Sequence, residues 1–388
     1  MKRIAFFILA LVPGLTAGVL LLEPVFRSNT TLLPRGIAAP LPVDPPLTDR
    51  WYEVRYTDAD IFYWQSGIIQ PPEEDLLEAV VHWRTDEFGF PNPAPVPAQV
   101  DLVVLGRSYA MGAQAVDPWP SVLREQRGYR VLNLSQTGAG IHEKQDFLTR
   151  FGLPRNPKYA VIEIIPPKDI LGYGPAAEPL VVQRAAFPFL QTAWRRLFPP
   201  AAGGGSSGYV YPLGLEWPGG GCDCVFYSGY LAALSLSKED WAASAEWAAY
   251  RNDLAGLIAT MREAGVIPIL LYVPTKETVY TALISDPASM TDALAAAGSW
   301  MLEDGVLRKI GAGTDPRDLQ SNAAASADLI QSFGGELSTC VVDPTEAFAA
   351  AGRNGIDPFM RYDSHWSAEG HALAAGALAA AMDGGNCR

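Results

Sequence analysis

Short apolar runs that alternate with helical patterns constrain the fold of this chain more than any other feature of its sequence. The first clear run, Leu102–Leu105, is too short for a helix and ends at Gly106, which is typical of a fully buried strand. Further strands are predicted at residues 129–134, 158–165, 266–273 and 338–342, and helices at 118–127, 141–151, 241–264, 288–310, 316–333 and 367–382. Strands that alternate with helices predict a parallel sheet with right-handed crossovers and helices on both faces.

Ser108 follows the first predicted strand on a tight glycine turn, Gly106-Arg107-Ser108. In open parallel sheets, ligands bind outside the carboxyl ends of the strands, so this hydroxyl is well placed for chemistry. Serine is a weak nucleophile until a base takes its proton. A serine at such a turn is also a common helix cap, and the turn alone leaves both interpretations open.

A candidate base lies near the other end of the chain, in Asp363-Ser364-His365. A carboxylate two residues before an imidazole can orient the ring and fix the tautomer that leaves its other nitrogen free to act on Ser108. An isolated Asp-x-His pair is as often structural as catalytic. The pair together with Ser108 at a strand end favours nucleophilic catalysis.

Other strand ends supply further candidate site residues. Gly138 follows the second strand in a glycine turn that leads into a helix amino terminus, where free N–H groups can hold an anion. An ordinary turn that needs glycine for its dihedral angles explains Gly138 equally well. Lys168 follows the third strand and Thr275 follows the fourth. The sheet is therefore expected to place these residues and Ser108 along one edge.

The charge and the cysteines limit the partners and cofactors. The net charge of −13, with no Lys/Arg cluster beyond Arg195-Arg196 after the amino terminus, argues against nucleic acid. We expect no metal and no cofactor, because Cys222 and Cys224 have no nearby histidine and no nucleotide motif is present. Four cysteines fit an oxidising compartment. Spacing does not fix their connectivity; one pairing would join Cys222 or Cys224 to Cys340 or Cys387.

The amino terminus has the pattern of an export signal. Lys2 and Arg3 precede an apolar run over residues 4–22, which is just long enough to span a bilayer. We expect an uncleaved anchor over residues 1–23 with the rest of the chain outside the cytoplasm, and a buried helix is the alternative. Residues 24–95 are predicted to form a proline-rich stalk and an extension with strands between residues 51 and 83, and residues 96–385 the main domain.

Residues 172–237 interrupt the regular alternation of strands and helices. Two glycine-rich stretches, at residues 203–208 and 219–221, adjoin several aromatic residues: Tyr209, Tyr211, Trp217, Phe226, Tyr227 and Tyr230. The pattern predicts a long insertion beside the site. It would act as a lid or a glycan-binding surface, or be a mobile loop without either role.

The order of these motifs resembles the SGNH (GDSL-type) hydrolase superfamily. Four stretches resemble its alginate O-acetyltransferase-type branch: Gly106-Arg-Ser-Tyr109, Val161-Ile-Glu-Ile-Ile-Pro166, Pro274-Thr-Lys-Glu-Thr-Val-Tyr280 and Tyr362-Asp-Ser-His-Trp-Ser-Ala-Glu-Gly370. The likeness runs from about residue 86 to residue 382. It implies a flavodoxin-like, three-layer α/β/α fold with a parallel central sheet.

The resemblance also implies roles for individual residues. Ser108 would be the nucleophile, His365 the general base and Asp363 the residue that orients it, with the N–H groups of Ser108 and Gly138 as the oxyanion hole. The other residues implied at the oxyanion or substrate side are Arg107, Tyr109, Lys168 and Trp366. Arg107 stands where the superfamily commonly has aspartate, and Lys168-Asp169 where many members have an oxyanion asparagine.

The implied function is acyl transfer on carbohydrate outside the cytoplasm. An O-acetyltransferase or acetylesterase would act on an exported or cell-envelope polysaccharide through a Ser-His-Asp triad and an acyl-enzyme. The expected partners are the polysaccharide or acetylated sugar, the membrane through the amino-terminal helix, and a membrane acyltransferase that supplies acetyl groups. The alternative is a catalytically inactive glycan-binding or scaffold protein of a polysaccharide assembly, and a simple secreted carboxylesterase would differ only in the acceptor.

Overall fold

The computed structural model describes residues 50–54, 79–112, 115–173, 208–210, 214–222, 224–311, 313, 315–361 and 363–387, with the backbone alone at 50–54, 79–83 and 209. The predicted anchor at residues 1–23, residues 24–49 and 55–78 of the predicted stalk and extension, and residues 174–207 of the predicted insertion lie outside these ranges, as do Tyr211 and Tyr362. Among the described helices, none combines the length and the apolar character needed to cross a membrane.

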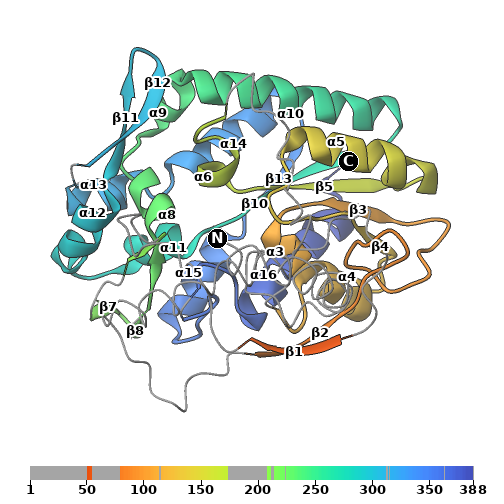
Figure 1. The fold of residues 1–388 in the computed structure, drawn as a ribbon, viewed down its shortest axis with the longest axis horizontal. Coiled ribbons are helices and arrows are strands. Elements are labelled where there is room, and N and C mark those ends of the chain that lie inside the picture. Colours follow the sequence, from red (N-terminus) through yellow and green to blue (C-terminus); the bar gives the residue numbers. More distant parts are fainter. Residues whose placement is uncertain are drawn as a thin grey trace, which may run out of the picture.

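A five-stranded parallel sheet forms the centre of the molecule (Figure 1). Its strands are β3 (Leu102–Leu105), β4 (Val131–Asn133), β5 (Tyr159–Ile164), β10 (Ile267–Tyr272) and β13 (Cys340–Val342). They lie in the order β13-β10-β5-β3-β4, and every neighbouring pair is parallel. Counted along the chain this order is 2-1-3-4-5, the flavodoxin-like arrangement. The predicted parallel α/β sheet is confirmed.

Helices cover both faces of the sheet and give two separate hydrophobic cores. In β3, Leu102 and Val104 point into one core, while Val103 and Leu105 point into the other. The first core contains residues of α4 (Trp119–Arg127) and α16 (Ala368–Asp383); the second contains residues of α5 (Ile141–Phe147), α10 (Ala245–Glu263) and α14 (Ala325–Glu336). Burial on both faces explains why these strands are almost continuously apolar.

The remaining elements are shorter and several lie outside the sheet. The helices are α3 (Ser108–Met111), α6 (Pro166–Asp169), α8 (Ser228–Ala233), α9 (Lys238–Ala243), α11 (Lys276–Leu283), α12 (Thr291–Ala297), α13 (Pro316–Asn322) and α15 (Thr345–Arg353). The strands are β1 (Arg50–Val54), β2 (Ala79–Trp83), β6 (Tyr209–Val210), β7 (Leu215–Trp217), β8 (Gly220–Cys222), β9 (Phe226–Tyr227), β11 (Ser299–Glu303) and β12 (Val306–Ile310). The expectation of strands between residues 51 and 83 is met by β1 and β2, which pair antiparallel.

The helix predicted over residues 288–310 is wrong. A short 3₁₀ turn and α12 occupy its first part, and β11 and β12 form an antiparallel hairpin in its second part. Asp304 and Gly305 connect the two strands with φ angles of 52° and 78°. A type I′ hairpin turn requires positive φ at both central positions, and Asp-Gly is a preferred pair for it. The Asp-Gly turn therefore outweighs the helical pattern.

Three other predicted helices are interrupted or change type within their predicted ranges. The helix predicted over residues 241–264 is divided at Ser244, whose extended backbone ends α9 and whose Oγ accepts the Trp247 N–H at the start of α10. Residues 316–333 divide into α13 and α14. In the helix predicted over residues 141–151, α5 ends at Phe147 and continues as a π-helical turn, Leu148–Gly152.

The disulfide pairing suggested by the sequence is also wrong. Cys222 bonds to Cys224, and Cys340 bonds to Cys387, with Cα–Cα distances of 5.4 and 5.1 Å. The first pair joins the last residue of β8 to Cys224, two residues further along the chain. The second joins the start of β13 to the segment after α16, and these two elements are in contact.

Candidate active site

The turn that carries Ser108 is closely packed. The N–H of Gly106 donates to Ser135 Oγ at 3.0 Å. A Cβ at Gly106 would lie 2.4 Å from the Cβ of Ala110 and 2.7 Å from Ser135 Oγ, so only glycine fits. Ser108 begins α3 directly after β3, and its side chain is half-buried. The fold therefore places the hydroxyl at the carboxyl edge of the sheet.

The loop that carries Gly138 lies against this turn. The Gln136 N–H donates to the Gly106 carbonyl at 3.2 Å, and the Thr137 hydroxyl donates to Met111 Sδ at 3.1 Å. In the part of the chain that the structure describes, the backbone N–H groups of Ser108 and Gly138 have no acceptor. Two such donors at the edge of the sheet are available to a developing oxyanion.

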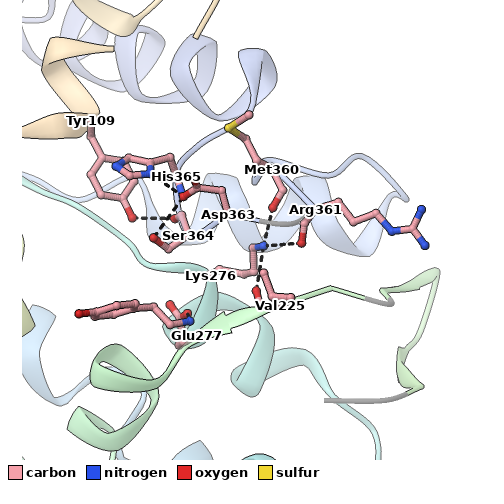
Figure 2. A network of polar contacts seen from close by, with 10 residues as sticks. Tyr109, Val225, Lys276, Glu277, Met360, Arg361, Asp363, Ser364 and His365 are labelled. Carbon is pink, nitrogen blue, oxygen red and sulfur yellow. Dashed lines mark hydrogen bonds and ion pairs between the residues drawn. The ribbon is translucent and has the colours of Figure 1, made fainter. Parts of the chain in front are cut away.

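Asp363 and His365 form a close pair. The carboxylate Oδ1 of Asp363 lies 2.6 Å from His365 Nδ1 and also accepts the His365 backbone N–H at 3.0 Å (Figure 2). Asp363 is buried, whereas 17% of the His365 side chain is exposed. A carboxylate at Nδ1 selects the tautomer with a proton on that nitrogen, which leaves Nε2 free to accept another.

The two partners of this pair shift each other's pKa. Burial lowers the pKa of His365, but the charge and hydrogen bond of Asp363 outweigh it, so the pKa is raised above its usual value. Burial raises the pKa of Asp363, and the effect of His365 outweighs it, so the Asp363 pKa is lowered. The imidazolium that forms when His365 takes a proton is therefore stabilised.

Tyr109 and Trp366 hold the histidine loop in place. The Tyr109 hydroxyl donates to the Ser364 carbonyl at 2.7 Å, and its ring centroid lies 4.7 Å from that of His365. Since Tyr109 follows Ser108 in the chain, these contacts bring the loop that carries His365 next to the turn that carries Ser108. The Trp366 indole N–H donates to the Pro274 carbonyl at 3.0 Å. Both aromatic side chains are buried, so these contacts are with the protein, and their predicted contact with substrate stays a prediction.

Arg107 and Lys168 face different surroundings. Arg107 Nε lies 2.8 Å from Asp169 Oδ1, and its side chain is largely buried. The exposed Lys168 donates from Nζ to the Tyr227 hydroxyl at 2.9 Å and lies 4.2 Å from the centre of that ring. Tyr227 belongs to β9, within the predicted insertion. The predicted place of Lys168 at the oxyanion or substrate side stays a prediction. Thr275 is buried as the N-cap of α11.

A buried layer of charges beneath the serine turn was not predicted from the sequence. Glu163 Oε1 accepts the Arg107 N–H at 2.8 Å, and the Glu163 carbonyl accepts from Lys144 Nζ at 2.7 Å. Lys144 Nζ also lies 3.9 Å from Asp169, and all three side chains are buried. Burial raises the pKa of Glu163 and lowers that of Lys144. A signal existed: Glu163 is the only charged residue in Tyr159–Ile164, and a charge in a buried strand needs partners.

A hydroxyl at a strand end, a carboxylate-oriented imidazole and two N–H groups without an acceptor among the described residues are the kinds of group that acyl transfer uses. Among the residues with described positions, no group of three or more His, Cys, Asp or Glu side chains could hold a metal ion.

No family model matches the chain, and no curated protein matches it. Several solved structures overlap it, among them a lipolytic protein described as of the G-D-S-L family from Desulfitobacterium hafniense (11% identity, 71% of this chain and 96% of that chain, TM-score 0.36). The lipase/acylhydrolase from Enterococcus faecalis overlaps it with 13% sequence identity over 74% of this chain and 96% of that chain, with a TM-score of 0.36. A catalytic mutant of an acetylxylan esterase from Geobacillus stearothermophilus overlaps it with 12% sequence identity over 72% of this chain and 92% of that chain, with a TM-score of 0.34. With such identities and TM-scores below 0.5, these likenesses assign neither a reaction nor a substrate to this chain.

Proposed function

We propose that this chain is a serine-dependent acyltransferase or esterase of the SGNH type. The observation that carries the proposal is the Asp363–His365 pair, 2.6 Å apart, on a loop that Tyr109 ties to the Ser108 turn. A structural Asp-x-His pair would not need to lie beside a strand-end serine. It would also not need an imidazole that is partly exposed.

The proposed reaction has two halves. His365 Nε2 takes the proton of Ser108, and Ser108 Oγ attacks the ester carbonyl while the N–H groups of Ser108 and Gly138 bind the oxyanion. The C–O bond of the ester then breaks, the leaving alcohol takes the proton from His365, and an acyl-serine remains. In the second half, His365 deprotonates an acceptor hydroxyl, whose oxygen attacks the acyl carbonyl. The bond between that carbonyl carbon and Ser108 Oγ then breaks, and Ser108 Oγ takes the proton back from His365. Water as acceptor gives an esterase, and a sugar hydroxyl gives a transferase.

We propose an O-acetylated carbohydrate as substrate, and Lys168 and Tyr227 as part of the acceptor side. Support comes from the motif resemblance given above and from the position of Lys168, whose charge acts on the pKa of His365. An ammonium and a phenol at the mouth of the site suit an acceptor that carries many hydroxyl groups. Lys168→Met, with Lys238→Met on the surface as the matched control, should raise KM for the sugar acceptor. Hydrolysis of a small ester should stay almost unchanged at a pH well above the acid limb, because loss of the Lys168 charge raises the His365 pKa.

We further propose that the enzyme works outside the cytoplasm, anchored by residues 1–23 and supplied with acetyl groups by a membrane acyltransferase. The charged start and apolar run of this segment support export. The pairing of all four cysteines supports an oxidising compartment. Replacing residues 1–23 by a cleavable export signal should reduce acetylation of the polysaccharide in the cell. Unchanged acetylation would exclude the role of the anchor.

The decisive experiment measures p-nitrophenol release from p-nitrophenyl acetate by the full-length chain, Ser108→Ala and His365→Gln. We expect release that depends on both residues, and acetylated sugar among the products when oligosaccharides are present. Release that equals the Ser108→Ala background, in a protein with a cooperative thermal transition, would refute the enzyme and favour the glycan-binding alternative. Release without acetylated sugar for any acceptor would leave an esterase.

A further inference from the structure

The start of α11 carries buried charges that the proposed reaction does not use. Thr275, Lys276 and Glu277 follow β10 directly, and their side chains are at most 1% exposed. An ammonium and a carboxylate in the interior are costly unless both are paired and hydrogen-bonded. Their partners therefore indicate what the two charges do.

Lys276 is bonded to the backbone of the histidine loop. Its Nζ donates to the carbonyls of Met360 and of Arg361, the latter at 3.0 Å, and to the carbonyl of Val225 at 3.1 Å (Figure 2). An ammonium has three protons, so it can donate to each of these three carbonyls. Met360 and Arg361 lie three and two residues before Asp363. The ammonium thus binds the backbone of the segment that leads to Asp363 and His365.

Glu277 is the second buried charge at the start of α11. Its Oε1 accepts the Tyr227 N–H at 2.5 Å, and burial raises the pKa of Glu277 to about 7. Lys276 opposes that rise through its charge. A variant that removes Lys276 alone would leave Glu277 as an uncompensated buried acid, so Lys276 is removed only together with the Glu277 carboxyl. Glu277→Gln alone leaves Lys276 with its carbonyl partners and can serve as the comparison.

We propose that Lys276 is a positioning residue for the base: it fixes residues 360–361 so that Asp363 presents its carboxylate to His365 beside Ser108. The Lys276 side chain does not need to touch a substrate for this role. The effect on catalysis rests on the proposed function, but the alignment of Asp363 with His365 can be measured without any reaction.

The direction in which the His365 pKa shifts when Lys276 is replaced distinguishes a positioning role from a direct effect of the Lys276 charge. Loss of a nearby positive charge would raise the pKa of an imidazole. Loss of the aligned Asp363 carboxylate would lower it, because that carboxylate is what raises it now. Glu163 and Lys168 also act on His365, and both remain in every variant. A fall in the pKa therefore reports lost alignment.

The test compares Lys276→Met/Glu277→Gln with Glu277→Gln in the full-length chain. Histidine-labelled NMR follows the titration of His365, assigned with His365→Gln, together with the far-downfield proton of its bond to Asp363. We expect the double variant to lower the His365 pKa, weaken that proton signal and reduce kcat for p-nitrophenyl acetate at least tenfold, with KM little changed. Misplacement of a catalytic group by about 1 Å can cost 100-fold.

Arg262→Met is the matched control. Arg262 also holds a loop through oxygen atoms, those of Leu337, Ser338 and Thr339, but at the opposite end of the sheet. Arg262→Met should lower the temperature midpoint of unfolding and leave the His365 pKa unchanged. A folded double variant whose His365 pKa is unchanged or raised would overturn the proposal. If that double variant does not fold, Lys276→Gln/Glu277→Gln takes its place, since the Gln side chain at position 276 keeps an N–H donor. A fall in its His365 pKa would support the proposal, and an unchanged or raised pKa would overturn it. An inactive wild-type protein would refute the proposed function, while the NMR result would still decide the role of Lys276.

Discussion

Replacing Asp363 by asparagine tests how the histidine is oriented. In many triads this change allows the amide to turn its NH₂ group toward the imidazole, which selects the wrong tautomer and costs about 10⁴-fold in kcat. Here Oδ1 accepts the His365 backbone N–H as well as facing Nδ1. The backbone N–H requires an oxygen at that position. An asparagine is therefore expected to keep its carbonyl oxygen toward the ring and to preserve the Nδ1–H tautomer.

The expected loss is then the loss of the charge alone. Two unit charges about 4 Å apart interact by about 4 kcal/mol at an effective dielectric constant near 20. A neutral acceptor in place of a charged one gives a lower bound of about 2 kcal/mol. At 1.36 kcal/mol per factor of ten, kcat for Asp363→Asn should fall by roughly 30- to 1,000-fold. The His365 pKa should also fall, because the carboxylate that raises it is gone.

The assay is hydrolysis of p-nitrophenyl acetate across the pH range, with Asp363→Ala as the comparison and thermal unfolding as the check of folding. Activity requires neutral His365, so the acid limb of kcat/KM in the wild type should lie above the usual histidine pKa and move to lower pH in Asp363→Asn. A loss of 10⁴-fold or more would show that the backbone N–H does not fix the amide. A loss below tenfold would refute the assigned role of the carboxylate.

Three further changes test the turn, a buried histidine and a disulfide. Gly106→Ala, whose Cβ would lie 2.4 Å from a neighbouring side chain, should lower the free energy of unfolding by about 1–3 kcal/mol and reduce esterase activity, whereas Gly256→Ala, in open space on α10, should not destabilise. Burial lowers the pKa of His371 to about 3, so as the pH falls below 6 the unfolded chain binds a proton there before the folded chain does. The free energy of unfolding of the wild type should therefore decrease with falling pH more steeply than that of His371→Gln. The difference in slope should reach about 1.4 kcal/mol per pH unit, measured by urea titration at each pH. Cys340→Ser/Cys387→Ser opens a link across 47 residues and should cost about 4 kcal/mol in urea denaturation, and an unchanged midpoint would contradict the stabilising role of the link.

The sequence predicts those parts of the site whose partners are near in the chain or share an edge of the sheet. Asp363 and His365 are two residues apart, and Ser108 follows an apolar strand, so local patterns suffice. The parallel sheet follows from repeated apolar runs that are buried on both faces. The hairpin at β11 and β12 carried a readable signal in Asp304-Gly305, but the surrounding alanine-rich pattern favoured a helix.

The parts that could not be predicted depend on backbone groups far away in the chain. Lys276 binds carbonyls of Val225, Met360 and Arg361, and no residue type at those positions announces a carbonyl acceptor. The same holds for Lys144, which binds the carbonyl of Glu163. Every residue offers a carbonyl, so only the fold decides which ones a buried lysine reaches. The disulfides failed for a related reason, since pairing depends on which ends meet.

The site brings together loops from three neighbouring strands, and this explains how the base is tuned. The segment with His365 is tied on one side to the loop after β3 through Tyr109 and on the other to the loop after β10 through Trp366. Strand β5 lies between β3 and β10 in the sheet, so its carboxyl end lies between the ends of those two strands. Glu163 and Lys168 come from that end and shift the His365 pKa in opposite directions, up and down respectively. The basicity of the base thus depends on the charges at the end of the central strand as well as on Asp363, and changes there should move the acid limb of activity even where no contact with His365 is lost.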